Sequence, residues 1–222
     1  MYEFSGAGDH PGRVILTDDP LRAKMLAAHH LENAVLMHEQ KEALLYFGSY
    51  GETAIALAAA GSGNSSVLDL ARELSSFDIS EIVYVGVCAS ATEQIALRSV
   101  LLADGGSRSL LNRALTAAAR TGVEVAVRAV SAPGGAGGGA GVGSSTGSST
   151  DTVAGMGTGD TGVYDDITTA FYERAKIDGV DALSILTVSE NTKTGEKMEE
   201  HERRSRLNAA ARLVFETMAL DN

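Results

Sequence analysis

The chain has 222 residues, of which 44% are hydrophobic and 21% charged, a composition typical of a folded globular protein rather than a disordered polymer. Lysine and arginine total 18 against 29 aspartates and glutamates, which gives a formal net charge of −11 at pH 7. This balance argues against a partner such as duplex nucleic acid, because its binders need a concentrated positive surface to displace counterions. The length suits a single domain.

The one cysteine, Cys88, excludes an intramolecular disulfide and fits a reducing compartment. Acidic residues without an apolar core occupy the start of the chain, so we expect no signal peptide. No apolar run approaches the length of a membrane-spanning helix, and the histidines show no metal-ligand spacing. We therefore predict a soluble, cytoplasmic protein with no metal site and no membrane partner.

A tract rich in glycine and serine, PGGAGGGAGVGSSTGSST, occupies residues 133–150. It has no charge and no periodic apolar face, so it cannot bury enough surface to offset its ordering entropy. We predict a flexible insertion at about 133–162 within one domain that spans residues 1–222. Phosphate binding is the weaker alternative, because no strand precedes the tract and no helix or lysine follows it.

Strand-like and helix-like segments alternate along the rest of the chain. Strands are predicted at residues 14–16, 43–50, 53–60, 82–87, 95–103, 123–130 and 182–188, and helices from Asp19-Pro20, after a turn at 61–66, and at 110–121, 165–177 and 196–220. The residues predicted to face inward are Leu21, Met25, Ala28 and Leu31 in the first helix, Val67, Leu70, Ala71 and Leu74 in the second, and Leu207, Ala211, Val214 and Met218 in the last. This order indicates an α/β domain with a central mixed β-sheet flanked by helices.

The first candidate site is the junction where a strand ends at Thr17 and a helix begins at Pro20. Free amides and the positive end of the helix dipole favour an anion there, and Arg22 in the first turn could clamp it. The alternative is a capped helix with a solvated arginine. Asp18 and Asp19 argue against an anion, because they already place carboxylates at that helix end.

Two further strand ends carry candidate residues. The turn GSGNSS at 61–66 allows close backbone approach to an anion, although a structural turn with Ser65 or Ser66 as helix N-cap explains it equally well. Glu190 follows a buried strand at the edge where α/β sheets bind ligands, and it could serve as a general acid; a solvated loop glutamate is the alternative. For Cys88, a buried inert thiol is favoured over a nucleophile.

Several motifs, taken in order, resemble the trimeric/hexameric purine nucleoside phosphorylase family of bacteria. DDPLRAK at 18–24 is similar to that family's GDPLRAK, GSGNSS at 61–66 to its GMG-x-x-S turn, YVGVCAS at 84–90 to RVGSCGA, IALRSV at 95–100 to VKLRDV, and ALSILTVSEN at 182–191 to ALTICTVSDH, while LENA at 31–34, FGSY at 47–50 and ERRSRLN at 202–208 keep its spacing. The resemblance covers most of the chain. It implies a nucleoside-phosphorylase-like three-layer domain, with a loop deleted before Leu110.

The resemblance also implies a reaction and partners. In this family, phosphate attacks the anomeric carbon of a ribonucleoside while the C–N bond breaks through an oxocarbenium-like state. Arginines and amides hold the phosphate, and an aspartate with a helper arginine protonates the purine. The implied protein is a pentosyltransferase of purine salvage with phosphate as co-substrate, no cofactor, and a homohexamer built from dimers.

Carried over by position, the implied phosphate ligands are Arg22, Lys41 (where a neighbouring subunit usually contributes an arginine) and Gly63. Tyr84 occupies a third phosphate-arginine position, Val87 replaces a hydroxyl residue, and Asp18 replaces a glycine. All three departures weaken anion binding, since each lost charge-assisted hydrogen bond is worth roughly 1.5–3 kcal/mol.

Glu190 stands at the position of the catalytic aspartate and Arg203 at that of its helper arginine. The implied nucleoside-binding residues are Ser66, Cys88, Ala89 and Asp166. Asn191 replaces a histidine, and the ribose-binding Met-Glu pair falls on Asp166 and Ile167, so Asp165 or Asp166 would have to bond the hydroxyls.

Two classes of function follow from these residues. The first is a purine nucleoside phosphorylase-like protein with an eroded phosphate and ribose site. The alternative is a weak or inactive paralogue that acts as a partner subunit or ligand sensor, or a nucleosidase that needs no phosphate.

Overall fold

The computed structural model describes residues 11–40, 43–61, 64–133, 162–205 and 207–221. Its elements are β1 (Arg13–Thr17), α1 (Pro20–His30), β2 (Glu32–Gln40), β3 (Ala43–Tyr50), β4 (Thr53–Ala59), α2 (Asn64–Leu74), β5 (Glu81–Ser90), β6 (Val100–Ala103), α3 (Arg108–Thr121), β7 (Val125–Arg128), β8 (Val163–Tyr164), α4 (Thr168–Asp178), β9 (Asp181–Asn191), β10 (Glu196–Lys197), α5 (Glu200–Ser205) and α6 (Asn208–Ala219).

A ten-stranded mixed sheet runs through the centre in the order β2-β3-β4-β1-β5-β9-β6-β7, with β8 paired to β5 and β10 to β9. The strands β4, β1, β5 and β9 are parallel to one another, whereas β3 and β6 run antiparallel to their neighbours β4 and β9. The carboxyl ends of the four parallel strands therefore meet at one edge of the sheet. The predicted α/β class with a central mixed sheet is confirmed.

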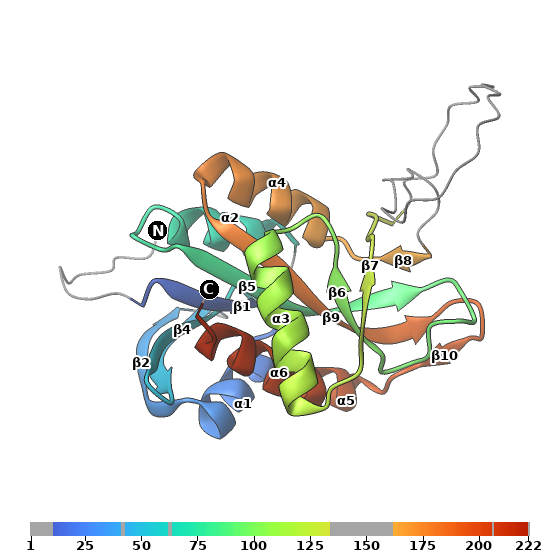
Figure 1. Cartoon of the computed structure of the whole chain (residues 1–222), viewed down its shortest axis with the longest axis horizontal. Helices are drawn as coiled ribbons and strands as arrows, with labels where there is room; N and C mark the ends of the chain where they lie inside the picture. The colour runs from blue at the N-terminus through green and yellow to red at the C-terminus, as the bar shows by residue number, and fades with distance from the viewer. Residues whose placement is uncertain (1–10, 41–42, 62–63, 134–161, 206, 222) are drawn as a thin grey trace.

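Helices cover both faces of the sheet (Figure 1). One face packs against α1, α3 and α6, and the other against α2 and α4. Side chains alternate along β5 in the way a pleated strand requires, so Val83 and Val85 face the first layer and Ile82 and Tyr84 face the second. This alternation decides that Tyr84 points toward α2 and α4.

Several local predictions are confirmed. The hairpin around Gly51 forms between β3 and β4. In α2, the expected residues Val67, Leu70, Ala71 and Leu74 are all buried. The 133–162 insertion falls almost entirely outside the described residues, as do Lys41 and Gly63.

The inward face predicted for the first helix was wrong at Leu21 and Ala28, which are exposed, whereas Leu31 is buried as predicted. In α1 the buried residues are Arg22, Ala23, Leu26 and Ala27, whereas Leu21 is exposed. The side chain of Arg22 reaches the backbone carbonyl oxygen of Val85 in β5. The side of α1 that carries Arg22 therefore faces the sheet, because the buried guanidinium needs the hydrogen-bond acceptors that it finds there.

The single helix predicted at 196–220 was also wrong. Glu196 and Lys197 pair with β9 as β10, and α5 and α6 follow as separate helices. The backbone N–H of Met198 donates to the carbonyl of Ser189 at 2.8 Å, which holds this segment to β9. Sheet hydrogen bonds to the preceding strand thus replace the helical ones.

Two other strand predictions need correction. The strand predicted at 95–103 shortens to β6, because the chain turns through Arg98, whose φ is 70°. The edge strand β2, which no sequence signal predicted, pairs antiparallel with β3.

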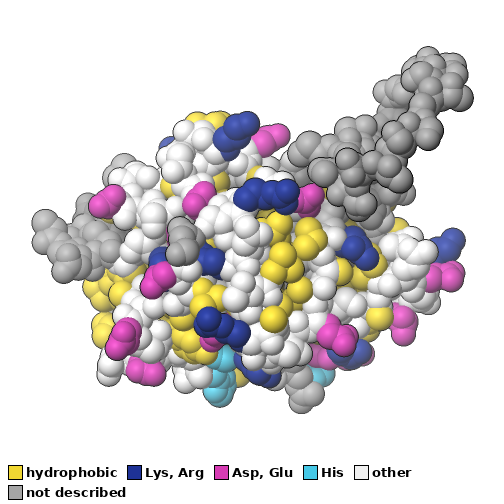
Figure 2. All heavy atoms as spheres, viewed as in Figure 1, with side chains coloured by type: hydrophobic (Ala, Val, Ile, Leu, Met, Phe, Trp, Pro, Cys, Tyr) yellow, Lys and Arg dark blue, Asp and Glu magenta, His cyan; other side chains and the backbone are white. Residues whose placement is uncertain are grey.

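In the described part of the chain, the surface charges (Figure 2) and the lengths of the helices agree with the sequence-based expectation of neither a basic patch nor a membrane-spanning helix. On the face shown in Figure 2, acidic and basic side chains are interspersed rather than gathered into a basic patch. Within the described ranges, no helix has both the length and the apolar character needed to cross a membrane.

Candidate functional site

The carboxyl ends of β1, β5 and β9 bring most of the predicted site residues to one edge of the sheet. Ala89 in β5 lies opposite Glu190 in β9, and on its other side it pairs with Tyr164 of β8. The residues that follow β8, Asp165 and Asp166, therefore lie beside the same strand end. Ligands of α/β sheets bind at such an edge.

Arg22 is the most constrained residue of this edge. Asp19 caps α1 by accepting hydrogen bonds from the backbone N–H groups of Leu21 and Arg22, which places Arg22 directly after the end of β1. Its side chain is only 5% exposed. Nη1 donates to Thr17 Oγ1 at 2.9 Å, to Asp18 Oδ1 at 2.5 Å and to the carbonyl of Val85 at 3.3 Å.

The same guanidinium connects two of the predicted site residues. Nη2 of Arg22 donates to the backbone carbonyl of Arg203 in α5 at 3.2 Å. The Nε atoms of Arg22 and Arg203 are both buried without a hydrogen-bond partner among the residues that the structure describes. A buried donor left unpaired costs about 1–3 kcal/mol, so an acceptor supplied by a ligand would be favoured here.

Tyr84 fills the position where the family resemblance implies a phosphate-binding arginine. Its side chain is buried, and its ring packs against Phe171 with the ring centroids 6.2 Å apart. The ring lies over Gly86: a methyl group added at Gly86 would stand 2.3 Å from the phenol oxygen. Burial, followed by the negative charges of Asp18 and Asp165, raises the pKa of Tyr84 well above its usual 10.0, so its hydroxyl stays neutral.

Asp165 is buried at the start of α4, whereas Asp166 is exposed. The Asp165 carboxylate accepts hydrogen bonds from the backbone N–H of Thr168 at 2.8 Å and from its hydroxyl at 2.6 Å. Burial is the main cause that raises the pKa of Asp165. Of the two aspartates, Asp165 is thus the one held in a fixed position, and Asp166 is the one that solvent reaches.

Cys88 behaves as a buried thiol. It is 4% exposed, and burial, assisted by the charge of Asp165, raises its pKa far above the usual value. The thiol therefore stays protonated, which excludes a thiolate nucleophile at neutral pH. Contact between Cys88 and a nucleoside stays a prediction.

Glu190 forms an ion pair with Lys197, with Oε2 and Nζ 3.0 Å apart, and its side chain is 40% exposed. Among the described side chains, the guanidinium of Arg203 makes no ion pair with this carboxylate. Sequence reasoning missed Lys197, because it placed that residue inside a helix. The signal available in the sequence was Gly195, a residue typical of a hairpin turn directly before Glu196. In the structure Gly195 adopts a φ of 76°.

Three further residues named from the sequence are Ser66, Lys41 and Asn191. Ser66 lies in the first turn of α2 and is half-buried. Lys41 lies outside the described residues, and the strand that follows it, β3, begins beside the end of β4, where Leu44 pairs with Ala59. Asn191 has a structural role: its side-chain amide donates to the carbonyls of Thr92 and Ile95, both at 2.9 Å.

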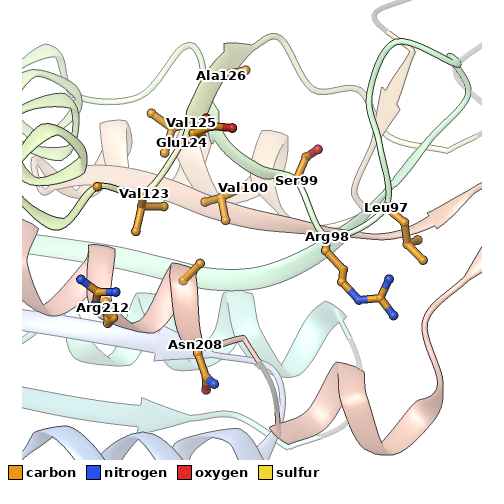
Figure 3. A pocket seen from close by; sticks show the side chains of 12 residues that line it. Leu97, Arg98, Ser99, Val100, Val123, Glu124, Val125, Ala126, Asn208 and Arg212 are labelled. Atoms are coloured by element: carbon orange, nitrogen blue, oxygen red, sulfur yellow. The ribbon is translucent and has the colours of Figure 1, made fainter.

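A separate cavity of about 780 Å³ lies between the starts of β6 and β7 and the start of α6. In Figure 3, Val100 and Val123 lie between Arg98 and Arg212. Arg98 binds Glu202 in a bidentate ion pair, with distances of 2.5 and 2.9 Å. No predicted site residue lines this cavity. Where side chains are described, no cluster of three or more His, Cys, Asp or Glu residues could hold a metal ion.

Comparison with known proteins finds two relatives in sequence and one solved structure of similar fold. No family model matches the chain. The DeoD-type purine nucleoside phosphorylase of Bacillus subtilis is 32% identical over 213 residues, which cover 86% of this chain and 87% of the relative. The DeoD-type enzyme of Bacillus velezensis is 29% identical over 93% of this chain and 94% of its own length. A purine nucleoside phosphorylase from Toxoplasma gondii, solved in complex with immucillin-H, shares the fold with a TM-score of 0.75 over 95% of this chain and 91% of its own, at 15% identity.

Proposed function

Because this chain belongs to the DeoD-type purine nucleoside phosphorylase family, we propose that it cleaves the N-glycosidic bond of purine ribonucleosides with inorganic phosphate as co-substrate. The expected family and the expected phosphorylase-like character are confirmed by its relatives. The alternative of a sensor, a partner subunit or a phosphate-independent nucleosidase is not favoured. The reaction needs no cofactor, and we place it in the cytoplasm.

The observation that carries the proposal is the position of Arg22. Its buried guanidinium stands at the end of β1 and beside Val85 in the middle of β5, it touches α5 through the carbonyl of Arg203, and its Nε lacks a partner among the described residues. A cation buried at a strand end suits an anion that must be held in a fixed position beside a sugar. We therefore assign phosphate to the side of the site formed by Arg22.

Glu190 is the proposed general acid. It ends β9 beside Ala89, and it reaches solvent enough to exchange a proton. Protonation of the purine as the C–N bond breaks neutralises the negative charge that builds on the leaving base. We propose that Arg203, in α5, stabilises that charge.

We further propose nucleoside contacts at Ser66, Ala89, Cys88 and Asp166. Asp165 is the better-held aspartate near the expected ribose position, because Thr168 fixes its carboxylate. A hydroxyl of the ribose would then bond one of these two aspartates instead of the glutamate that the family uses.

The decisive experiment measures release of hypoxanthine from inosine with and without phosphate, together with the formation of ribose 1-phosphate. We expect base release that depends on phosphate, and a fall in kcat of at least about 100-fold in Glu190→Gln. Glu93→Gln, which neutralises an exposed carboxylate in the loop after β5, is the matched control. Base release that does not depend on phosphate would contradict the proposed reaction, and a fully active Glu190→Gln would remove Glu190 from its role.

We also propose that the protein is a homohexamer built from dimers, in which Lys41 completes the phosphate site of a neighbouring copy. The edge strand β2 supports self-association, because it exposes the side chains of Val35 (56%), Leu36 (43%) and Met37 (53%). Sedimentation velocity of the full chain gives its mass, and a monomer at all concentrations would contradict this proposal.

A further inference from the structure

We propose that Asp18 is a built-in competitor of phosphate: its carboxylate occupies Nη1 of Arg22, so phosphate must displace it to bind that side of the guanidinium. This inference rests on the proposed function, since it assumes that Arg22 is a phosphate ligand. It goes further, because it names the group that sets the affinity for phosphate in this chain.

The contact between the two side chains is direct. Asp18 Oδ1 lies 2.5 Å from Nη1 of Arg22, and the pair joins the residue after β1 to the first turn of α1. A carboxylate and a phosphate oxygen offer the same kind of acceptor to an arginine, so both compete for the same N–H groups. Arg22 cannot satisfy both through Nη1, which also donates to Thr17 and to the carbonyl of Val85.

Burial makes this competition matter. The Arg22 side chain is only 5% exposed, so its ion pair is poorly screened by water. The side chain of Asp18 is 30% exposed, which leaves the carboxylate a route into solvent when an anion arrives. Because Thr17 and Val85 remain as acceptors, Arg22 keeps its place on the sheet when Asp18 leaves.

The neighbouring groups do not compensate for Asp18. The side chains of Tyr84 and Val85 lie on opposite faces of β5, and the carbonyl of Val85 accepts a hydrogen bond from Arg22. The hydroxyl of Tyr84 is neutral, so it adds no positive charge. Asp165 is a further carboxyl group, close enough to Asp18 for the charge of Asp18 to add to the rise in the pKa of Asp165 that burial causes. Among the described side chains that interact with Asp18 and Tyr84, Arg22 supplies the positive charge, and its ion pair with Asp18 neutralises that charge.

The size of the effect follows from the free energy of one charge-assisted hydrogen bond, which corresponds to about a ten- to hundredfold change in affinity. When the competent state is only a fraction of the population, the apparent Kd is the intrinsic Kd divided by that fraction. Removing the carboxylate should therefore lower the Kd for phosphate by about ten- to hundredfold, while the turnover of bound substrate changes little.

The test titrates inorganic phosphate into the full-length protein by calorimetry and measures the KM for phosphate in the inosine reaction. Asp18→Asn keeps the shape of the side chain and removes its charge, and Asp18→Gly is the second variant should the first fold poorly. Asp69→Asn, at an exposed position of α2, makes the same change in net charge elsewhere. We expect the Kd and KM for phosphate to fall in the Asp18 variants and to stay unchanged in Asp69→Asn.

A further variant assigns the effect to the ion pair. Adding Arg22→Lys to Asp18→Asn should abolish most of the gain, because the lysine cannot reproduce the planar donor geometry. Phosphate-dependent turnover with an unchanged phosphate KM in Asp18→Asn would overturn this inference and leave the proposed function standing. Turnover without phosphate, combined with no phosphate binding by any variant, would overturn both.

Discussion

The packing of Tyr84 over Gly86 predicts a strong coupling between these two residues. A methyl group at Gly86 would stand 2.3 Å from the phenol oxygen of Tyr84, 2.4 Å from its Cζ and 2.6 Å from its Cε1. The whole ring would have to move, and it cannot move freely, because it is 1% exposed and packs against Phe171. Gly86→Ala should therefore be costly wherever the tyrosine ring is present.

The magnitude can be worked from the two environments. Overpacking a well-packed core costs about 1–3 kcal/mol, which is the expected loss for Gly86→Ala in the wild-type chain. In a Tyr84→Ala background the ring is gone, and alanine is favoured over glycine within a strand by roughly 0.5–1 kcal/mol. The free energy of coupling between the two positions should thus be at least about 1.5 kcal/mol.

The assay is urea unfolding of wild type, Gly86→Ala, Tyr84→Ala and the double variant. Their free energies of unfolding are compared after checking that the m-values are the same. Gly106→Ala is the control, because its added methyl group would lie 2.4 Å from the backbone carbonyl oxygen of Ala182, a clash that removing Tyr84 cannot relieve. An equal cost of Gly86→Ala with and without the tyrosine ring would show that Tyr84 does not lie where the structure places it.

Two further variants test the surroundings of the site. Burial raises the native pKa of Asp165 above its usual 3.8, so its protonated form contributes stability that is present below that value and is lost as pH rises through the native pKa. Asp165→Asn should therefore gain stability relative to wild type as the pH rises above about 4 in urea unfolding, and a difference that does not change with pH would contradict the reasoning. Tyr172→Phe removes a hydroxyl that donates to the carbonyl of Ala103 at 2.9 Å and accepts from the N–H of Ser184 at 2.8 Å. It should cost about 1–3 kcal/mol in thermal or urea unfolding, and a loss below about 0.5 kcal/mol would refute a paired hydroxyl.

Local patterns were enough to predict much of the fold. The hairpin between β3 and β4 follows from two strand-like runs around a glycine turn, and the buried face of α2 follows from apolar residues at helical spacing. Asp19 and Pro20 marked the start of α1 correctly, because N-caps act through neighbouring backbone groups. Each of these signals depends on residues close together in the chain.

The family resemblance proposes residues for the site but says nothing of their contacts. It assigns functional positions to Arg22, Glu190 and Arg203, which stay predictions, and it marks Tyr84 and Asp18 as departures. It did not indicate that Asp18 pairs with Arg22, that Arg22 meets the backbone of Arg203, or that Lys197 pairs with Glu190.

The sequence by itself determined the α/β class, the positions of most strands and helices, and the membership of the family. Only the tertiary structure decided which face of α1 is buried, that residues 196–197 join the sheet as β10, and that β2 forms an edge strand. For α1 the reason is a long-range partner, because Arg22 bonds the carbonyl of Val85 in β5. The strands β10 and β2 pair with their neighbours in the chain, β9 and β3, and they are held there as part of the folded sheet. Long-range partners can override local preferences, and they come together only when the sheet has formed.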